Sequence, residues 1–240
     1  MNIPNPLPGL PVESGEGNGS PPTRPAMTVD IHPQDPMEPI TQSPPEKSAR
    51  RWNSPYDALG LEPQVSVYLT QFAYSRVCLH SVSDMDNEVG GVLVGEWCLD
   101  EASQRQFIIV EAARAARHTR QSSVHLTFTP DSLVDIHNEI DNKYPGKKIV
   151  GWYHTHPRMG IFLSHYDTWL HKYFFPEHWQ VALVIEPHTA KGGIFIRQAN
   201  GLFDPSRYFG FYEMDGNHEN SLVHWTNLTP EVKEGETSNE

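Results

Sequence analysis

The sequence predicts an α/β protein, a mixed sheet flanked by helices, because strand-like and helix-like segments alternate along the chain. Between Trp52 and about Tyr212, short apolar runs typical of strands are interleaved with longer segments whose apolar residues recur every three or four positions. Nearly all of the aromatic residues fall in this stretch. Its length fits one ordinary domain.

Three strands and one helix are predicted in the first half of the stretch. Val65, Val67 and Leu69 alternate as in a short strand. A helix is predicted over 72–84, followed by strands over 89–97 and 106–111. Gly90 and Gly91 interrupt the second strand, and a glycine within a strand indicates that another part of the chain approaches closely.

The second half is predicted to hold two helices and four strands. Thr129 and Pro130 are typical of a helix start, because threonine caps the first turn and proline is tolerated at its first position. This helix is predicted to end near residues 144–146. A second helix is predicted over 164–175, where aromatic residues recur at helical spacing until Pro176 stops it. Strands are predicted over 124–128, 148–153, 179–185 and 193–197.

The two ends of the chain differ from this stretch in composition. Twelve of the 21 prolines lie within residues 1–50, where aromatic and periodic apolar residues are scarce. We therefore expect residues 1–52 to form a disordered Pro/Gly-rich tail and residues 53–212 to form the folded domain. Residues 213–240 contain seven acidic residues and one lysine, which predicts an acidic C-terminal tail. The proline spacings would suit a polyproline II ligand, but a flexible tether is the simpler explanation.

Charge and hydropathy exclude several classes of protein. The 240 residues carry a formal net charge of −12, whereas a nucleic-acid partner requires a basic face. No run approaches about 18 consecutive apolar residues, and the N-terminus lacks the basic and apolar regions of a signal peptide. The two cysteines, Cys78 and Cys98, lack the C-x-x-C spacing, so any metal must be held by nitrogen and oxygen. The sequence thus predicts a cytoplasmic protein with neither a nucleic acid nor a membrane as partner.

One segment, Val150 to Asp167, contains the residues that indicate chemistry. His154 and His156 are two positions apart at the end of a predicted strand, so both imidazoles project from the same face. Pro157 ends the strand, and Ser164 then opens a helix with Asp167 three positions further on. Two histidines and one carboxylate are a recurring catalytic zinc set, in which three protein ligands leave a fourth position for water.

Each of these residues also has a purely structural explanation. Ser164 and Asp167 fit a variant of the capping box, which needs no metal. Two histidines on one strand face could equally be a satisfied pair beside Trp152. The occurrence of His-x-His-Pro together with Ser-x-x-Asp makes coincidence a poor explanation.

Glu88 is the candidate base for such a site. A water molecule activated by zinc needs a neighbouring group that takes its proton and delivers it to the leaving amine. Glu88 precedes a glycine-rich apolar strand, where nothing structural calls for a carboxylate. The alternative is an exposed acid at the end of a strand.

Together these residues resemble the JAMM (MPN-plus) metalloprotease family. The family signature is a glutamate before a glycine-rich strand, followed by His-x-His-Pro and Ser-x-x-Asp, and this chain matches it without a substitution. The resemblance covers about residues 65–197 and is strongest to the AMSH enzymes and the proteasome-lid deubiquitinase. It implies a mixed curved sheet flanked by helices, with 53–212 as the catalytic domain.

The resemblance also implies a role for each residue of the signature. One catalytic zinc ion would be held by His154, His156 and Asp167. Glu88 would be the general acid/base, and Ser164 would donate a hydrogen bond to the tetrahedral oxyanion. No cysteine follows Cys98, so the second, structural zinc of the AMSH enzymes is expected to be absent, and with it the basis for lysine-63 linkage selectivity.

The implied activity is that of a zinc-dependent isopeptidase. It would hydrolyse the bond between the C-terminal glycine of ubiquitin or a ubiquitin-like protein and a lysine, or would mature a ubiquitin-like precursor. The extended tail of the modifier would be received as an added strand, and we expect the basic loop 114–123 to meet the modifier, unless that loop is simply a solvated one. Phe162 either lines the lysine side of the cleft or belongs to the core.

A non-catalytic scaffold subunit is the alternative function, since many MPN domains serve only in assemblies. Scaffold members commonly lack the metal ligands, whereas this chain keeps all three together with Glu88 and Ser164. The small size and the lack of adaptor domains favour a prokaryotic stand-alone enzyme. The sequence leaves the oligomeric state open.

Overall fold

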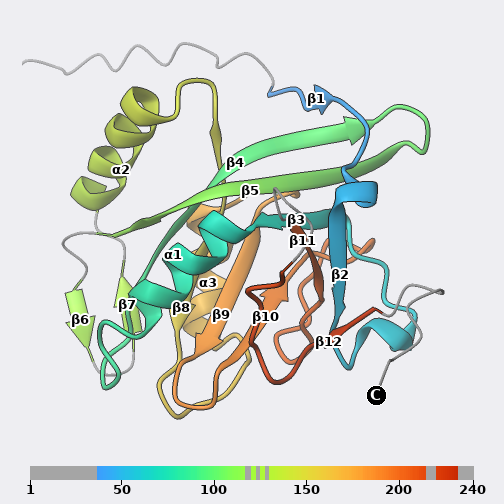
Figure 1. The fold of residues 1–240 in the computed structure, drawn as a ribbon. Coiled ribbons are helices and arrows are strands. Elements are labelled where there is room, and N and C mark those ends of the chain that lie inside the picture. Colours follow the sequence, from blue (N-terminus) through green and yellow to red (C-terminus); the bar gives the residue numbers. More distant parts are fainter. Residues whose placement is uncertain (1–36, 117–119, 123–124, 128–129, 215–219, 232–240) are drawn as a thin grey trace, which may run out of the picture. The chain divides into compact units, whose positions relative to one another are not determined.

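The computed structural model describes residues 37–116, 120–122, 125–127, 130–214 and 220–231. The chain divides into Met1–Met37 and a compact unit, Glu38–Glu240, to which every element below belongs. Within the described residues, a ten-stranded mixed sheet is flanked by three α-helices (Figure 1). The predicted class is therefore confirmed. No helix in the described part of the chain is long and apolar enough to cross a membrane.

The sheet has the strand order β10-β9-β8-β4-β5-β3-β11-β2-β12, with β1 paired to β4. The sheet contains both parallel pairs (β8 with β9, β3 with β5, β3 with β11 and β1 with β4) and antiparallel ones, among which the long β4–β5 hairpin is the largest. The strands are β1 (Ile40–Thr41), β2 (Ala49–Asn53), β3 (Ser66–Thr70), β4 (Gly90–Asp100), β5 (Arg105–Ala115), β8 (Lys148–Thr155), β9 (Val181–Glu186), β10 (Lys191–Phe195), β11 (Phe211–Met214) and β12 (Thr229–Pro230). A separate two-stranded sheet pairs β6 (Arg120–Ser122) with β7 (His125–Thr127).

Three α-helices begin near the residues that the sequence indicates. In α1 (Gln71–Ser81), the Thr70 side chain caps the first turn by accepting from the Ala73 amide. Pro130 opens α2 (Pro130–Lys143), while Thr129 lies outside the described residues. The third helix, α3 (His165–Phe174), ends before Pro176. The prediction that α1 reaches Asp84 is wrong, because Asp84 instead accepts the amides of Asp86 and Asn87 and closes a turn.

The strands extend past residues 53–212. Strands β2 and β12 are paired with each other, and β2 also pairs with β11. Trp225 is buried in the main core cluster. The predicted strand 124–128 appears as β7, with residues 124 and 128 outside the described part.

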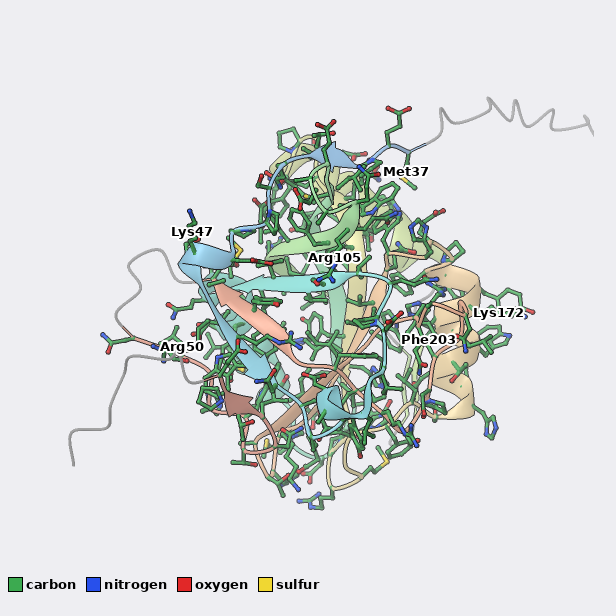
Figure 2. The ribbon with its side chains drawn as sticks, turned by 90° about the vertical axis from the view of Figure 1, so that its right-hand side faces the viewer. Met37, Lys47, Arg50, Arg105, Lys172 and Phe203 are labelled. Atoms are coloured by element: carbon green, nitrogen blue, oxygen red, sulfur yellow. The ribbon has the colours of Figure 1, made fainter. Side chains whose placement is uncertain are left out.

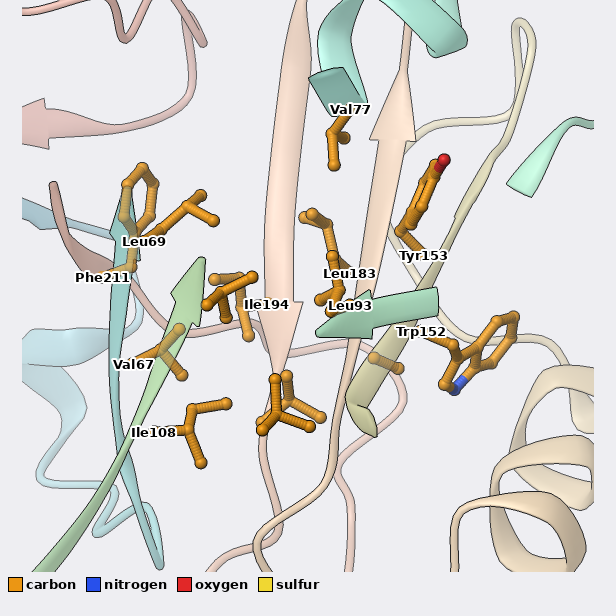
Figure 3. Packing of buried hydrophobic residues seen from close by; sticks show 14 of the residues in the cluster. Val67, Leu69, Val77, Leu93, Ile108, Trp152, Tyr153, Leu183, Ile194 and Phe211 are labelled. Atoms are coloured by element: carbon orange, nitrogen blue, oxygen red, sulfur yellow. The ribbon is translucent and has the colours of Figure 1, made fainter. Parts of the chain in front are cut away.

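The two faces of β8 are covered by different helices. Neighbouring residues on a strand point to opposite faces, and Figure 3 shows Trp152 and Tyr153 leaving their strand in opposite directions. The Trp152 indole donates to His171 of α3, whereas the Tyr153 hydroxyl is hydrogen-bonded to His80 of α1. Helices α1 and α3 therefore cover opposite faces of the sheet at β8.

Gly91 meets the close approach that the sequence predicts within this strand. A Cβ atom placed there would lie 2.0 Å from the Arg114 carbonyl oxygen on β5. Only a residue without a side chain permits this spacing between β4 and β5. The hairpin and its neighbour β8 form the frame of the site described next.

Candidate metal centre

The end of β8 and the start of α3 bring the three predicted metal ligands together. His154 lies on β8 opposite Gly90 of β4 and Val184 of β9. His156 follows the last residue of β8, and its amide donates to the Ile185 carbonyl at 2.8 Å, so it continues the pairing with β9. Asp167 lies in the first turn of α3. Two residues at the end of β8 and one at the start of α3 thus come together at the end of this strand.

The donor atoms of the three side chains face one another. His154 Nε2 lies 2.9 Å from His156 Nε2 and 3.3 Å from Asp167 Oδ1. His156 Nε2 lies 3.5 Å from Asp167 Oδ2. The three residues are almost fully buried, with exposed fractions of 0%, 2% and 5%.

The group fits a metal ion by both donor type and spacing. Two imidazoles and one carboxylate suit zinc, and a tetrahedral ion bound at about 2.0–2.1 Å requires donors about 3.3 Å apart. The observed separations of 2.9, 3.3 and 3.5 Å bracket that value. Within the described residues this is the single cluster of three or more such side chains that could hold a metal.

Asp167 also completes a capping box, so its structural role at the start of α3 and its role as a potential metal ligand are compatible. Its Oδ2 accepts the Ser164 amide at 2.7 Å, and the Ser164 hydroxyl oxygen accepts the Asp167 amide at 3.1 Å. The capping box fixes the carboxylate in the orientation that directs Oδ1 at His154. The capping bond uses the oxygen of the Ser164 hydroxyl, which leaves its hydrogen to interact with the Asp167 carboxylate or with a bound substrate.

Burial and charge keep the group in the state that binds a cation. Burial lowers the pKa of His154, and the neighbouring Asp167 only partly offsets this effect, which favours the neutral imidazole. Burial would raise the pKa of Asp167, but hydrogen bonds with His154, His156 and Ser164 outweigh it and hold the pKa below its ordinary value. A neutral imidazole and an ionised carboxylate are the forms that coordinate metals.

Aromatic packing orients the two imidazoles. The Trp152 ring is stacked on His154 with the ring centres 4.5 Å apart and 9° between the planes. Phe162 packs against His156 at 4.7 Å and is half-buried. Neither Nδ1 atom has a hydrogen-bond partner among the described residues, so ring contacts rather than hydrogen bonds set the orientation.

Trp152 is in turn held by α3. Its indole donates to His171 Nδ1 at 2.9 Å, and His171 also contacts Phe203, which lies beside α3 (Figure 2). Burial and the nearby Arg197 hold the pKa of His171 well below its ordinary value. This link was not predicted, although Trp152 stands two residues before His154 and therefore on the same face.

Glu88 lies beside His156 across the β4–β8 pair. The Val89 amide donates to the Thr155 hydroxyl and the Thr155 amide donates to the Val89 carbonyl, both at 2.9 Å. The second bond extends the Gly90–His154 register to Val89 and Thr155, and one more step of the same register would place Glu88 opposite His156, on the face of both histidines. Glu88 is 3% exposed, so it is not an exposed acid at a strand end.

The segment that was expected to be a basic loop begins within a strand. Arg114 belongs to strand β5, where it forms an ion pair with Glu139 of α2 and lies over the Tyr144 ring. Arg117 and the side chain of Arg120 lie outside the described residues. His165 and His178 are exposed and separate from the metal group, as expected for histidines that are not extra ligands.

The sequence also gave no prediction for Glu186, a buried carboxylate near the site. It ends β9 and accepts the Arg158 amide in the turn that follows His156. The available signal was an acid at the end of an otherwise apolar strand.

Comparison with known proteins places this fold and site in a family. Residues 63–176 match the family described as JAB1/Mov34/MPN/PAD-1 ubiquitin protease, and this range includes Glu88, Ser164 and the three potential ligands. The chain is 31% identical over 130 residues to the NAD(+) hydrolase TcpA of a Theionarchaea archaeon, over 53% of this chain and 36% of that protein. It is 25% identical to the 26S proteasome regulatory subunit RPN11 of Candida glabrata, over 62% of this chain and 47% of that subunit.

A third relative is the Lys-63-specific deubiquitinase BRCC36 of Xenopus tropicalis, 24% identical over 43% of this chain and 39% of that protein. The matches thus span less than half of each of these relatives. A solved structure from Desulfitobacterium hafniense is similar with a TM-score of 0.46 and 19% identity, over 65% of this chain and 99% of that one. Residues 63–176 of the chain thus form a domain of the JAB1/Mov34/MPN family.

Proposed function

We propose that this protein is a zinc-dependent isopeptidase that hydrolyses the bond between the C-terminal glycine of ubiquitin, or of a ubiquitin-like protein, and a lysine. The observation that carries the proposal is the buried group of His154, His156 and Asp167, with Glu88 on the same face of the sheet. Two relatives support the substrate class, because one is named as a deubiquitinase and the other as a proteasome subunit.

The side chains divide the work of amide hydrolysis among them. Zinc bound by the three ligands would supply Lewis-acid activation of the carbonyl group and of water. Glu88 takes a proton from the attacking water and delivers it to the lysine amine as the C–N bond breaks. Ser164 donates its hydroxyl hydrogen to the oxyanion of the tetrahedral intermediate.

The buried position of Glu88 supports a proton-transfer role. Glu88 is 3% exposed and lies two residues before β4, so water is largely excluded from its carboxylate. A buried carboxylate close to the reacting atoms is typical of a group that serves as both base and acid in hydrolysis. A purely structural metal site would not need Glu88.

A non-catalytic scaffold is the second candidate, since assemblies also contain members of this family. A scaffold surface requires shape alone, whereas this chain keeps three convergent metal donors and Glu88. The relative named as an NAD(+) hydrolase matches over 36% of its own length, so NAD⁺ belongs in the substrate panel.

Cleavage of a panel of conjugates tests the proposal. Ubiquitin dimers, ubiquitin-like fusions and NAD⁺ are incubated with zinc-loaded protein, with chelated protein and with His156→Ala. We expect cleavage of at least one isopeptide conjugate by the zinc-loaded protein alone, and none of NAD⁺. Equal cleavage after chelation would refute the zinc mechanism, and a protein that binds no zinc and cleaves nothing would favour the scaffold.

A further inference from the structure

We propose that Glu186 and His188 are positioning residues that hold the loop carrying Glu88. The loop comprises residues 83–88 and is called the Glu88 loop below. The proposal depends on the proposed function in one respect, namely that Glu88 takes part in turnover. The structural part stands on hydrogen bonds among three turns that meet beside the metal centre.

Glu186 joins two of these turns through its carboxylate. Oε1 accepts the amides of Arg158 and His188, each at 3.0 Å. Oε2 accepts the Thr189 amide at 2.8 Å and the Thr189 hydroxyl. One buried side chain, 2% exposed, therefore fastens the 156–160 turn to the β9–β10 turn.

The 156–160 turn contains an uncommon backbone conformation that contacts from outside the turn must stabilise. Arg158 has a φ of +63°, a left-handed conformation that is uncommon for a residue with a side chain. Such a conformation persists where neighbouring groups over-determine it. The bond from the Arg158 amide to Glu186 is one such group, and it fixes the chain two residues after His156.

Both turns reach the Glu88 loop. His188 Nε2 donates to the Met85 carbonyl at 2.8 Å. Arg158 Nη1 lies 3.1 Å from Asp86 Oδ1. Both contacts lie at the surface, so the two together, rather than either alone, join the turns to the loop.

The loop itself is short and locally closed, so a tether at Met85 is transmitted to Glu88. Asp84 accepts the amides of Asp86 and Asn87 at 3.0 and 2.9 Å. Beyond Glu88, the Val89 amide is bonded to the Thr155 hydroxyl at 2.9 Å. Glu88 therefore lies between one fixed point on β8 and another on the β9–β10 turn.

Burial would raise the pKa of Glu186, but the hydrogen bonds from Thr189, Arg158 and His188 outweigh it and hold the pKa below its ordinary value. The carboxylate is thus in the ionised form that can accept four hydrogen bonds. A glutamine in its place has one oxygen, so in either orientation the β9–β10 turn loses at least one acceptor.

The test compares Glu186→Gln with Glu213→Gln as a matched control. Glu213 is also 2% exposed and also accepts four hydrogen bonds, from Trp52, Gln71, Ser221 and Leu222, but it lies on β11. A second pair, His188→Ala with His178→Ala, compares two exposed histidines that each donate or accept one side-chain hydrogen bond. This pair keeps the test informative if the buried variants fold poorly.

Three quantities are measured: amide hydrogen exchange of the Glu88 loop, zinc stoichiometry, and kcat and KM on a cleaved conjugate. For Glu186→Gln and His188→Ala we expect loop exchange to rise about tenfold and kcat to fall about tenfold, with zinc stoichiometry and KM unchanged. The two control variants should leave loop exchange and kcat at the wild-type values.

Unchanged loop exchange in both Glu186→Gln and His188→Ala would overturn the proposal, as would equal changes in the two controls. Exchange and zinc content are measured without substrate. If the wild-type protein cleaves no conjugate, the proposed function fails while the exchange measurement still decides the positioning role.

Discussion

Substituting Ser164 by glycine should leave the protein folded but reduce isopeptidase turnover about 100- to 1000-fold. The hydroxyl oxygen caps α3 by accepting the Asp167 amide, and its hydrogen can turn toward the oxyanion. Glycine is itself a tolerated cap, so the expected loss of stability is a few tenths of a kcal/mol. The backbone amide at position 164 can still donate to Asp167 Oδ2, so the ligand keeps its orientation.

The magnitudes separate the two roles of this side chain. Ser164→Ala should cost about 1 kcal/mol of stability through the lost cap. Against a typical stability of about 5–15 kcal/mol, that loss leaves nearly all of the chain folded. Loss of an oxyanion donor raises the barrier by about 2.7–4 kcal/mol, which appears in kcat alone.

Stability is measured by urea unfolding, and turnover is measured by steady-state cleavage with zinc-loaded protein. Ser164→Thr keeps both the cap and the hydroxyl and should retain most activity. Thr70→Ala is the matched control, because Thr70 caps α1 in the same way and lies on another element. Turnover of Ser164→Gly within twofold of wild type would refute the oxyanion role, and an equal loss of turnover in Thr70→Ala would attribute the effect to capping.

Three further predictions follow from the site and the sheet. Burial lowers the pKa of His171, so near pH 6.5 the unfolded chain binds a proton that the folded chain excludes. The free energy of unfolding should therefore fall on acidification by up to about 1.4 kcal/mol per pH unit. In urea titrations of metal-free protein, His171→Gln, which can still accept from Trp152, should flatten this slope; an unchanged slope contradicts the assignment. Gly91→Ala would place a Cβ atom 2.0 Å from the Arg114 carbonyl oxygen and should cost at least about 1–3 kcal/mol, and an unchanged melting temperature would disprove the close approach. Zinc at 100 times its dissociation constant should stabilise the wild-type protein by about 2.7 kcal/mol and Asp167→Ala not at all, so equal melting shifts in calorimetry would exclude Asp167 as a ligand.

The sequence predicted the central part of the fold because its signals are local. Alternation at 65–69, a glycine pair at 90–91, the proline that opens α2 and the serine before α3 report on the residues next to them. The spacing of the two histidines likewise follows from the period of a strand.

The flanking strands escaped prediction because their stability is not local. Strand β2 has the sequence ARRWN, and its place in the sheet depends on pairing with β11 and β12. Trp52 is fixed by a hydrogen bond to Glu213, a partner 161 positions away. Neither the sequence of β2 nor that of β12 contains a pattern that reveals such a partner.

The site shows the same division between local and distant determinants. The capping box and the histidine pair were predictable, whereas the stacking of Trp152 on His154 and the bond from Trp152 to His171 join separate elements. Glu186 was overlooked for the same reason, since its donors come from two turns that only the folded sheet brings together. Local patterns identified the ligands, and tertiary packing supplies the groups that orient them.

The central claim is that a buried zinc ion and Glu88 together perform the hydrolysis. Native mass spectrometry of the wild-type protein and Glu88→Gln, with cleavage of an isopeptide conjugate measured on the same samples, tests it most directly. We expect one zinc ion in both proteins and turnover in the wild type alone. Turnover by Glu88→Gln at the wild-type rate, or the absence of zinc from an active wild-type protein, would contradict it.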